Sequence, residues 1–408
     1  MATFLKPADP AQVADAVRWA AADEVALEVL GAGTKRGLGR PVEAEHRLDL
    51  SGLTGIEMYE PAELVLTARA GTPLAEIEAA IEAERQQLAF EPPDYGPLYG
   101  GPAGAGTIGG ALACNLSGPR RLKAGAARDH FLGIAAVSGR GEPFKAGGRV
   151  VKNVTGYDIC KLLAGSHGTL AVMTDVTLKV LPAPERVRTV LLMGLGDEAA
   201  IAAMAAALKS PYEVSSAAHL PGGVAEGSGV DYVRDAATAV TAIRVEGPGA
   251  SVEARCESLR ALLSAHGEVE ELHSHRSTAF WREVGDARAF ASDGGGGALW
   301  RVSVPPAAGA AIAAEIGAAQ AGRHFYDWGG GLVWFEEAGE APAPTVAVHE
   351  AAARAGGHAL LIRAPEAARR EGAVFQPQTE GMGALSARVK ESFDPRGILN
   401  PGRMYAGV

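Results

Sequence analysis

Apolar residues in the first half of the chain fall at spacings typical of short helices and strands. Val13 and Val17 lie about one turn apart in the segment 10–22, which predicts an amphipathic helix with a proline in its first turn. The apolar run 25–30 predicts a strand that leads directly into the glycine-rich segment 31–39. Longer apolar runs predict further strands over 63–70, 131–138 and 170–181.

The second half repeats one pattern, in which an apolar strand is followed by an Ala-rich or amphipathic helix. Strands are expected over 190–195, 239–245 and 298–304, and a helix is expected after each of them. This pattern predicts an α+β fold with an antiparallel, ferredoxin-like sheet that has helices on one face.

Two prolines in the segment 181–185 mark the point at which the pattern changes. We therefore predict one domain over 1–185 and a second, α+β domain over 186–375. The segment 376–408 is rich in turn-forming residues, which a disordered tail would not need. It is expected to pack back on the first domain.

The composition is that of a globular protein. The chain has 408 residues, 47% of them hydrophobic and 21% charged, and this length favours two domains. The net charge of -10 argues against general nucleic-acid binding, which needs a basic face. The three cysteines form no C-x-x-C pair, so we expect no metal site, no iron–sulfur cluster and no disulfide framework in this chain.

The chain shows neither a signal core nor a membrane span. No stretch reaches the roughly 20 apolar residues that a spanning helix needs, and the N-terminus has no apolar signal segment. We expect a cytoplasmic protein, attached to the inner face of the cytoplasmic membrane only through partners.

Three glycine-rich segments are candidates for a phosphate cradle. In G-A-G-T-K-R-G-L-G, over 31–39, glycines would let successive amides point at one anion, although the segment alone fits a mobile turn equally well. The second segment, 104–118, places Gly109 and Gly110 at a predicted helix start, where free amides bind phosphate. A tight helix–helix contact is the alternative reason for glycine there. The third, 147–178, contains a tight G-S-H-G-T turn against which a flat ring could lie.

In this order and spacing, the three segments resemble the FAD-binding domain of the vanillyl-alcohol oxidase and p-cresol methylhydroxylase (PCMH) superfamily. The resemblance covers 1–185 and extends to F-D-P-R-G-I-L-N-P-G-R near the C-terminus. It implies a two-lobed PCMH-type FAD-binding domain followed by a cap domain. Because the first loop lacks the histidine to which some members attach FAD, we expect non-covalent FAD. The positions that match the family's FAD-binding residues are Gly31, Gly33, Thr34, Lys35, Thr107, Gly109, Gly110, Asn115, Gly118, Lys152, Asn153, Gly168, Thr169, Val172 and Asn400.

Within the superfamily, the chain is most similar to the FAD-binding subunits of bacterial glycolate oxidases that accompany the catalytic flavoprotein. The similarity rests on G-G-R-V-V-K-N-V-T-G-Y-D-I-C-K-L, L-W-R-V-S-V-P, F-Y-D-W-G-G-G-L-V-W and F-D-P-R-G-I-L-N-P-G-R-M-Y. It implies a complex with a paralogous FAD catalytic subunit and an iron–sulfur subunit, which oxidises glycolate or a similar 2-hydroxy acid to the 2-oxo acid.

The substrate side departs from related D-2-hydroxyacid dehydrogenases, which build a divalent metal site from G-H-x-G-D-G-N-x-H and a later E-H-G. Here R-H-F-Y-D-W-G-G-G keeps His324 and Asp327 but has Gly331 in place of the second histidine, and no E-H-G follows. We therefore expect no metal site. Arg301, in an apolar strand, is either a two-pronged clamp for a substrate carboxylate or part of a structural ion pair. His324 is either a catalytic base or a structural histidine.

These features leave three hypotheses for the function. The leading one is an FAD-binding subunit of a glycolate-oxidising complex. The second is a self-sufficient FAD-dependent D-2-hydroxyacid dehydrogenase that uses Arg301 and His324. The third is a structural subunit with no turnover of its own.

Overall fold

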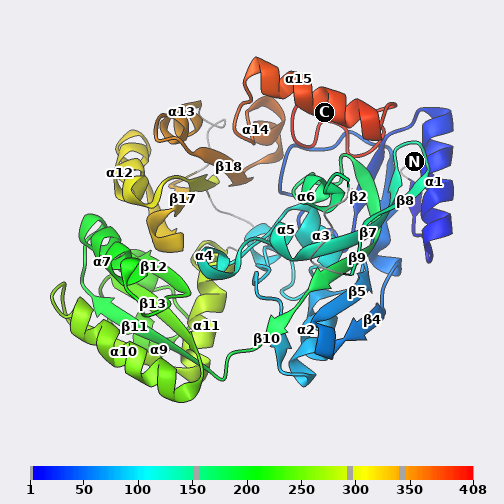
Figure 1. The fold of residues 1–408 in the computed structure, drawn as a ribbon. Helices are drawn as coiled ribbons and strands as arrows, with labels where there is room; N and C mark the ends of the chain where they lie inside the picture. The colour runs from blue at the N-terminus through cyan, green and yellow to red at the C-terminus, as the bar shows by residue number, and fades with distance from the viewer. Residues whose placement is uncertain (1–2, 150–155, 292–296, 340–345, 408) are drawn as a thin grey trace.

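The computed structural model describes residues 3–149, 156–291, 297–339 and 346–407. The first half of the chain, blue to teal in Figure 1, lies beside a second half drawn from green to brown. The C-terminal helix, in red, lies over the first half. Among the described residues, no helix is long and apolar enough to cross a bilayer.

The first half contains two main sheets, one parallel and one antiparallel. The parallel sheet has the order β1-β3-β2, with strands Thr3–Leu5, His46–Asp49 and Leu27–Leu30. The antiparallel sheet has the order β4-β5-β9-β7-β8, with strands Ile56–Glu60, Val65–Arg69, Ala171–Lys179, Phe131–Ser138 and Pro143–Gly147. The helices of this half are α1 (Pro10–Asp23), α2 (Leu74–Ala83), α3 (Ile108–Ala113), α4 (Arg121–Ala124), α5 (Ala127–His130) and α6 (Ile159–Leu163).

Local sequence explains helix α1 and its place in the fold. Asp9 caps its first turn by accepting a hydrogen bond from the Gln12 amide, and Pro10 occupies the first position, where no amide is needed. Val13 and Val17 are buried against the sheets, as their spacing predicts.

The second half forms one eight-stranded antiparallel sheet, which confirms the predicted α+β class. The strand order is β14-β11-β13-β12-β16-β17-β15-β18. In chain order from β11 to β18 these strands are Arg186–Met193, Ser216–Leu220, Val240–Gly247, Val269–His273, Leu299–Ser303, Gly322–Asp327, Leu332–Glu337 and His358–Arg363. We call this unit the cap domain. Its boundary at residue 185 stays a prediction.

Helices cover both faces of the cap sheet, where the sequence predicted only one. The outer face is covered by α7 (Asp197–Lys209), α10 (Gly249–Leu263), α12 (Gly309–Ala319) and α13 (Val346–Arg354). On the inner face, α11 (Ser274–Gly285) packs together with loops of the first half. Both faces are needed because alternate strand residues are apolar on both sides: Trp300 faces the outer core and Leu299 the inner one.

The C-terminal segment packs back on the first half, as predicted. After α14 (Glu366–Glu371), helix α15 (Glu380–Phe393) leads to Leu399, which forms a parallel bridge with Leu27 of β2. The buried Lys390 ammonium fixes this turn by donating to the carbonyls of Thr169 and Leu399 and to Asp394.

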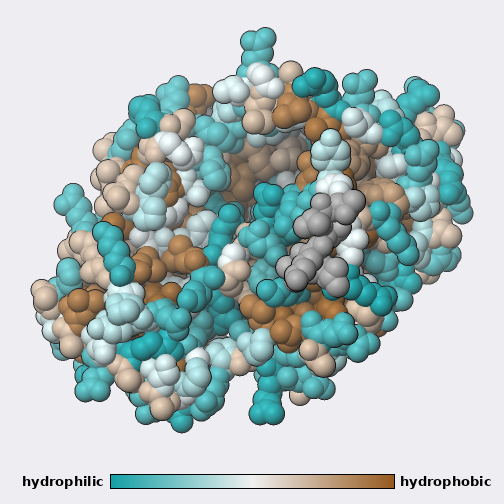
Figure 2. Space-filling view, in the orientation of Figure 1, coloured by the Kyte–Doolittle hydropathy of each residue, from teal (hydrophilic) through white to brown (hydrophobic). Residues whose placement is uncertain are grey.

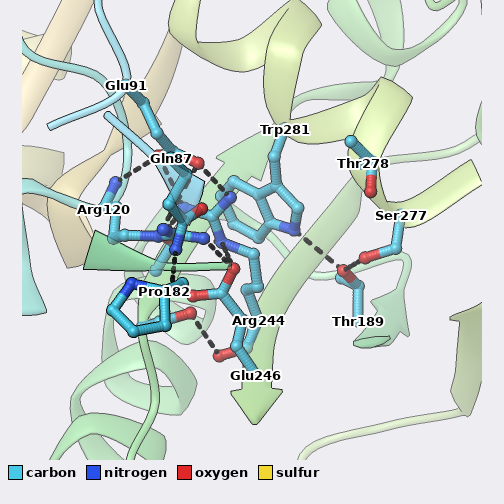
Figure 3. A network of polar contacts seen from close by, with 12 residues as sticks. Gln87, Glu91, Arg120, Pro182, Thr189, Arg244, Glu246, Ser277, Thr278 and Trp281 are labelled. Atoms are coloured by element: carbon cyan, nitrogen blue, oxygen red, sulfur yellow. Dashed lines mark hydrogen bonds and ion pairs between the residues drawn. The ribbon is translucent and has the colours of Figure 1, made fainter. Parts of the chain in front are cut away.

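A buried ion network joins the two halves (Figure 3). The Arg244 guanidinium of β13 donates to both oxygens of Glu91, each at 2.7 Å, and lies 4.9 Å from the Trp281 ring centroid. Arg120, from the first half, pairs with Glu246 of β13. Burial alone would raise the pKa of Glu91, but the charges and hydrogen bonds of Arg244 and Arg120 together outweigh it, so the pKa is lowered and the carboxylate stays ionised.

Removing one member of this network is expected to loosen the contact between the halves. Arg244→Gln should destabilise the protein by about 3–5 kcal/mol, because it removes both guanidinium bonds to Glu91 and leaves that carboxylate with the Arg120 amide and a longer contact to the Arg120 guanidinium. Urea unfolding followed by fluorescence measures the change. The matched control is Arg234→Gln, whose pairs with Asp231 and Asp235 are exposed and should contribute nothing measurable. Equal midpoints for Arg244→Gln and wild type would contradict the expectation.

Asp327 lies at the same interface and titrates in an unusual range. Its side chain is buried, at 2% exposure, and accepts a hydrogen bond from the Trp328 amide at 2.6 Å. Burial raises its pKa from 3.8 to about 7, although the amide hydrogen bond and the charge of Arg244 pull the other way. Because the folded state holds this proton more tightly than the unfolded state does, the contribution of Asp327 to the stability of the fold depends on pH. That contribution is full below pH 3.8 and is lost as pH rises toward 7.

Asp327→Asn, which cannot ionise but keeps an oxygen for the Trp328 amide, should therefore stabilise the protein most at high pH. At about 1.4 kcal/mol per pKa unit, its advantage over wild type should grow by about 2–3 kcal/mol between about pH 5 and pH 8. Denaturant titrations across that range test this. A difference that does not change with pH would show that Asp327 does not titrate as described.

Candidate functional site

The glycine-rich segments and the C-terminal segment meet around one cleft in the first half. The cleft holds about 830 Å³ of space between its walls, part of it open to solvent. The face of the molecule in Figure 2 is hollowed near the C-terminal segment, with apolar side chains in the hollow. Of the residues predicted to bind FAD, those that line the cleft are Gly31, Gly33, Thr34, Lys35, Thr107, Gly109, Gly110, Gly168 and Asn400.

The loop after β2 supplies a row of free amides. Gly33 adopts a positive φ of 71°, and within the described residues the amides of Ala32, Gly33, Thr34 and Lys35 donate no hydrogen bond to the protein. The Lys35 ammonium lies 3.1 Å from Thr34 Oγ1 at the edge of this row. Consecutive free amides beside a lysine form a suitable site for a phosphate group.

The start of α3 has a different role from the predicted one. The amides of Ile108 and Gly109 donate to carbonyls of Thr72 and Ala70, and that of Gly110 donates to Thr107 Oγ1 at 3.3 Å. These amides are engaged in the fold, so the prediction that they are free for a phosphate does not hold. Glycine serves close packing here, because a Cβ at Gly109 would lie 2.7 Å from the Ala70 carbonyl oxygen. The element that Gly109 packs against is the end of β5, whereas the alternative expected from the sequence is a second helix.

The same crowding explains a glycine of the first loop. A Cβ at Gly31 would lie 2.5 Å from Thr107 Oγ1, so a side chain there would separate the first loop from α3. The first two glycine-rich segments therefore form one wall of the cleft.

Asn400 joins the third segment to the first. Its Oδ1 accepts a hydrogen bond from the Val29 amide at 2.7 Å, and its Nδ2 donates to the His167 carbonyl at 2.9 Å. Gly168 has a φ of 72°, and a Cβ there would lie 2.8 Å from Asn400 Nδ2. Burial, aided by the charge of Arg403, lowers the pKa of His167 to about 3, so this cleft histidine is neutral.

Four predicted residues do not line the cleft. The carbonyl of Gly118 accepts a hydrogen bond from Trp328, and Asn115 accepts one from the Arg128 amide. Thr169 is buried and hydrogen-bonded to Ser166, and Val172 lies in the core beside α1. These four residues are held by other parts of the protein and do not face the cleft. Lys152 and Asn153 lie outside the described residues.

The cleft also contains charged residues that the sequence did not single out. Arg403, in the N-P-G-R-M-Y segment, donates to the Lys35 carbonyl at 3.0 Å and so supports the first loop. Arg36, a second cation of the first loop, pairs with Glu28 through two hydrogen bonds of 2.8 and 2.9 Å. Arg36 is therefore neutralised by Glu28. Within the described residues, no carboxylate pairs with Lys35, the other cation of the loop.

Arg301 and His324 are not brought together. Arg301 of β15 pairs across the sheet with Trp334, on the inner face that looks toward the first half. His324 of β16 pairs with Phe335 on the outer face, where its Nε2 lies 2.8 Å from Asp197. The His219 ring, whose Nε2 lies 3.5 Å from Asp197, and hydrogen bonds from His324 and Tyr326 hold the pKa of Asp197 well below its usual range.

Metal ligands do not cluster in the described part of the chain. Neither the inner nor the outer face of the cap sheet there gathers three His, Cys, Asp or Glu side chains in a geometry for a metal ion. His324 thus belongs to a hydrogen-bonded group with Asp197 and Tyr326.

Solved structures show which fold this is. The chain matches 4-ethylphenol oxidase from Gulosibacter chungangensis with a TM-score of 0.72, over 99% of this chain and 89% of that one, at 14% identity. It matches p-cresol methylhydroxylase with a TM-score of 0.70, over 98% and 88% of the two chains, also at 14% identity. The fold is therefore the PCMH-type one that the sequence predicted.

Sequence comparisons show the family. Residues 1–147 match the FAD binding domain family model, and residues 374–404 match that of the C-terminal domain of FAD linked oxidases. The chain is 32% identical to glycolate oxidase subunit GlcD of Bacillus subtilis, over 40% of this chain and 33% of that protein. It is 35% identical to glycolate oxidase subunit GlcE of Escherichia coli, over 96% of this chain and 95% of that protein. On this near full-length match, the chain belongs to the GlcE family of FAD-dependent oxidoreductase subunits.

Proposed function

We propose that this chain is the FAD-binding subunit of a complex that oxidises glycolate, or a similar small 2-hydroxy acid, to the 2-oxo acid. One observation carries the proposal: the row of free amides beside Lys35 opens into a cleft closed by Asn400, in a chain that aligns with GlcE over nearly its whole length. Bound FAD would supply the acceptor for the hydride that leaves the substrate.

The residues of the cleft fit the parts of FAD. The first loop would hold the pyrophosphate through its amides and Lys35, because two negative charges need donors without other partners. Gly31, Gly109 and Gly168 keep the walls close without filling the space. We further propose that FAD is bound without a covalent link.

The partners are a paralogous flavoprotein subunit and an iron–sulfur subunit. The names of the relatives GlcE and GlcD indicate a glycolate oxidase of several subunits. Cys114, Cys160 and Cys256 belong to separate parts of the described structure, so they do not form a ligand set for a cluster. An iron–sulfur centre that receives the electrons would therefore lie on a partner.

The self-sufficient alternative is weakened by the geometry. A clamp at Arg301 and a base at His324 would have to contact one substrate, yet the two side chains are on opposite faces of a sheet. The structural-subunit alternative requires a cradle that binds no FAD.

The first test is the cofactor itself. The purified chain should be yellow and should release intact FAD on acid precipitation, and Lys35→Gln should weaken FAD binding by about 10- to 100-fold, the usual loss for a charge-assisted contact. Lys123→Gln, at an exposed lysine paired with Glu213, is the control and should bind FAD as wild type does. A colourless chain that FAD cannot reconstitute would refute the proposal. Flavin that stays with the acid precipitate would refute only the non-covalent attachment.

The second test separates a subunit from an autonomous enzyme. We expect glycolate, added anaerobically, to leave the flavin of the isolated chain oxidised and to reduce flavin when the paralogous and iron–sulfur subunits are co-purified. Absorbance in the visible flavin band measures this. Stoichiometric bleaching of the isolated chain by glycolate would instead support the self-sufficient dehydrogenase.

A further inference from the structure

Two arginines from different halves of the molecule lie over one tryptophan. The Arg121 Cζ atom of α4 is 4.8 Å from the ring centroid of Trp328, and the Arg301 Cζ atom of β15 is 5.0 Å from it. Trp328 itself is 7% exposed and joins the halves by donating from Nε1 to the Gly118 carbonyl at 3.1 Å. Three segments that are far apart in sequence thus meet at one indole.

These two arginines differ from the other stacked arginines of the protein. In the described ranges, five arginines lie over aromatic rings, and three of them also hold a carboxylate: Arg47 pairs with Glu28, Arg244 with Glu91 and Arg323 with Glu336. For Arg121 and Arg301, no carboxylate or other hydrogen-bond acceptor lies within bonding distance of either guanidinium in the described parts of the chain. Within the described residues, the site therefore has two stacked cations and no carboxylate paired with either of them.

Such an arrangement is unfavourable unless something balances it. Burial, together with the charge of Arg301, lowers the pKa of Arg121, and the Arg301 Nε atom is buried without a hydrogen-bond partner. Stacking on an indole leaves the N–H groups of a guanidinium free in its own plane. Other groups also interact electrostatically with the pair: Asp129 and Arg128 with Arg121, and Tyr95, His358 and Asp327 with Arg301. In the described parts of the chain, none of them forms an ion pair with either arginine.

The backbone of Trp328 is in a strained conformation. Its φ is 52°, in the left-handed region that bulky residues avoid and that costs on the order of 1–3 kcal/mol. The Asp327 carboxyl group and the Gly118 carbonyl hold it there through its two N–H groups. The strained backbone places the indole within reach of both guanidinium groups.

The site adjoins the cleft described above. Cys114 lines the cleft, and both Cys114 and Arg301 act electrostatically on the buried Tyr95. The Tyr95 ring contacts that of Trp334, which is the direct cross-strand neighbour of Arg301. A small molecule at the two arginines would therefore lie between the cap sheet and the cleft.

We propose that Arg121 and Arg301 form a carboxylate-binding site that takes the acid group of a small 2-hydroxy acid or of its 2-oxo product. The inference rests on the proposed function for the identity of the acid, and on the unbalanced guanidinium pair for the site. A carboxylate matches the fork of donors that a guanidinium presents, and it would neutralise the pair. Arg121 comes from the first half, so the site is complete only when the two halves are joined.

The experiment uses the full FAD-loaded chain and glyoxylate as the probe, with binding measured by calorimetry and by the perturbation of flavin absorbance. Arg121→Gln and Arg301→Gln should each weaken glyoxylate binding by about 10- to 100-fold, as expected for a lost bond to a charged group. Arg301→Lys, which keeps the charge but not the fork, should lie between. Arg323→Gln is the matched control, since Arg323 is stacked on Phe290 but already paired with Glu336.

The outcomes separate this inference from the proposed function. Bound FAD and the thermal midpoint are measured for every variant, so loss of folding is distinguished from loss of the site. Variants that bind glyoxylate as wild type does, or a wild type that binds the neutral glycolamide equally well, would overturn the inference and leave the FAD function intact. Variants that lose FAD with the fold intact would overturn it too, because the arginines would then serve the cofactor. A chain that lacks FAD yet binds glyoxylate through both arginines would overturn only the proposed function.

Discussion

The side-chain amide of Asn400 is the contact on which the cleft depends. One end holds the Val29 amide at the end of β2, and the other holds the His167 carbonyl in the third glycine-rich segment. These segments are separated from Asn400 by 371 and 233 positions in the sequence. Only the return of the C-terminal segment brings them together, and Lys390 secures that return from inside. A chain that ended before this segment would have all three glycine-rich loops but no closed site.

Much of the fold could be predicted because its signals are local. The spacing of Val13 and Val17 predicts a helix over 10–22, and the structure has α1 at Pro10–Asp23. Val252, Cys256 and Leu259 lie in register on α10 and are buried together. Each prediction needs only a periodic pattern and a capping or turn residue nearby. The strands and helices of the cap domain follow from their local patterns in the same way.

What could not be predicted depends on direction and on distant partners. A one-residue step along a strand reverses the face of a side chain, so His324 and Asp327 of one motif point to opposite sides of the cap sheet. The sequence also does not show which amides are free. The glycines of the first loop resemble those at the start of α3, yet the α3 amides of Ile108 and Gly109 donate to the carbonyls of Thr72 and Ala70. In the first loop Gly33 takes a positive φ beside free amides, whereas Gly31 and Gly109 serve close packing. Arg121 carries no sequence signal of its role because its partner at the indole is 180 positions away.

The inner face of the cap sheet uses one arrangement twice. Arg244 of β13 and Arg301 of β15 both lie over a tryptophan and both face the first half. For Arg244 the first half supplies the carboxylate of Glu91, and the result is a buried ion pair that joins the two halves. For Arg301 it supplies a second guanidinium, that of Arg121, and no carboxylate within the described residues. The buried Arg244 is completed by a carboxylate of the protein, whereas the partly exposed Arg121 and Arg301 present unpaired donors that suit the carboxylate of a ligand. The same pairing of guanidinium with carboxylate therefore accounts for the junction between the halves and for the place where a substrate acid would bind.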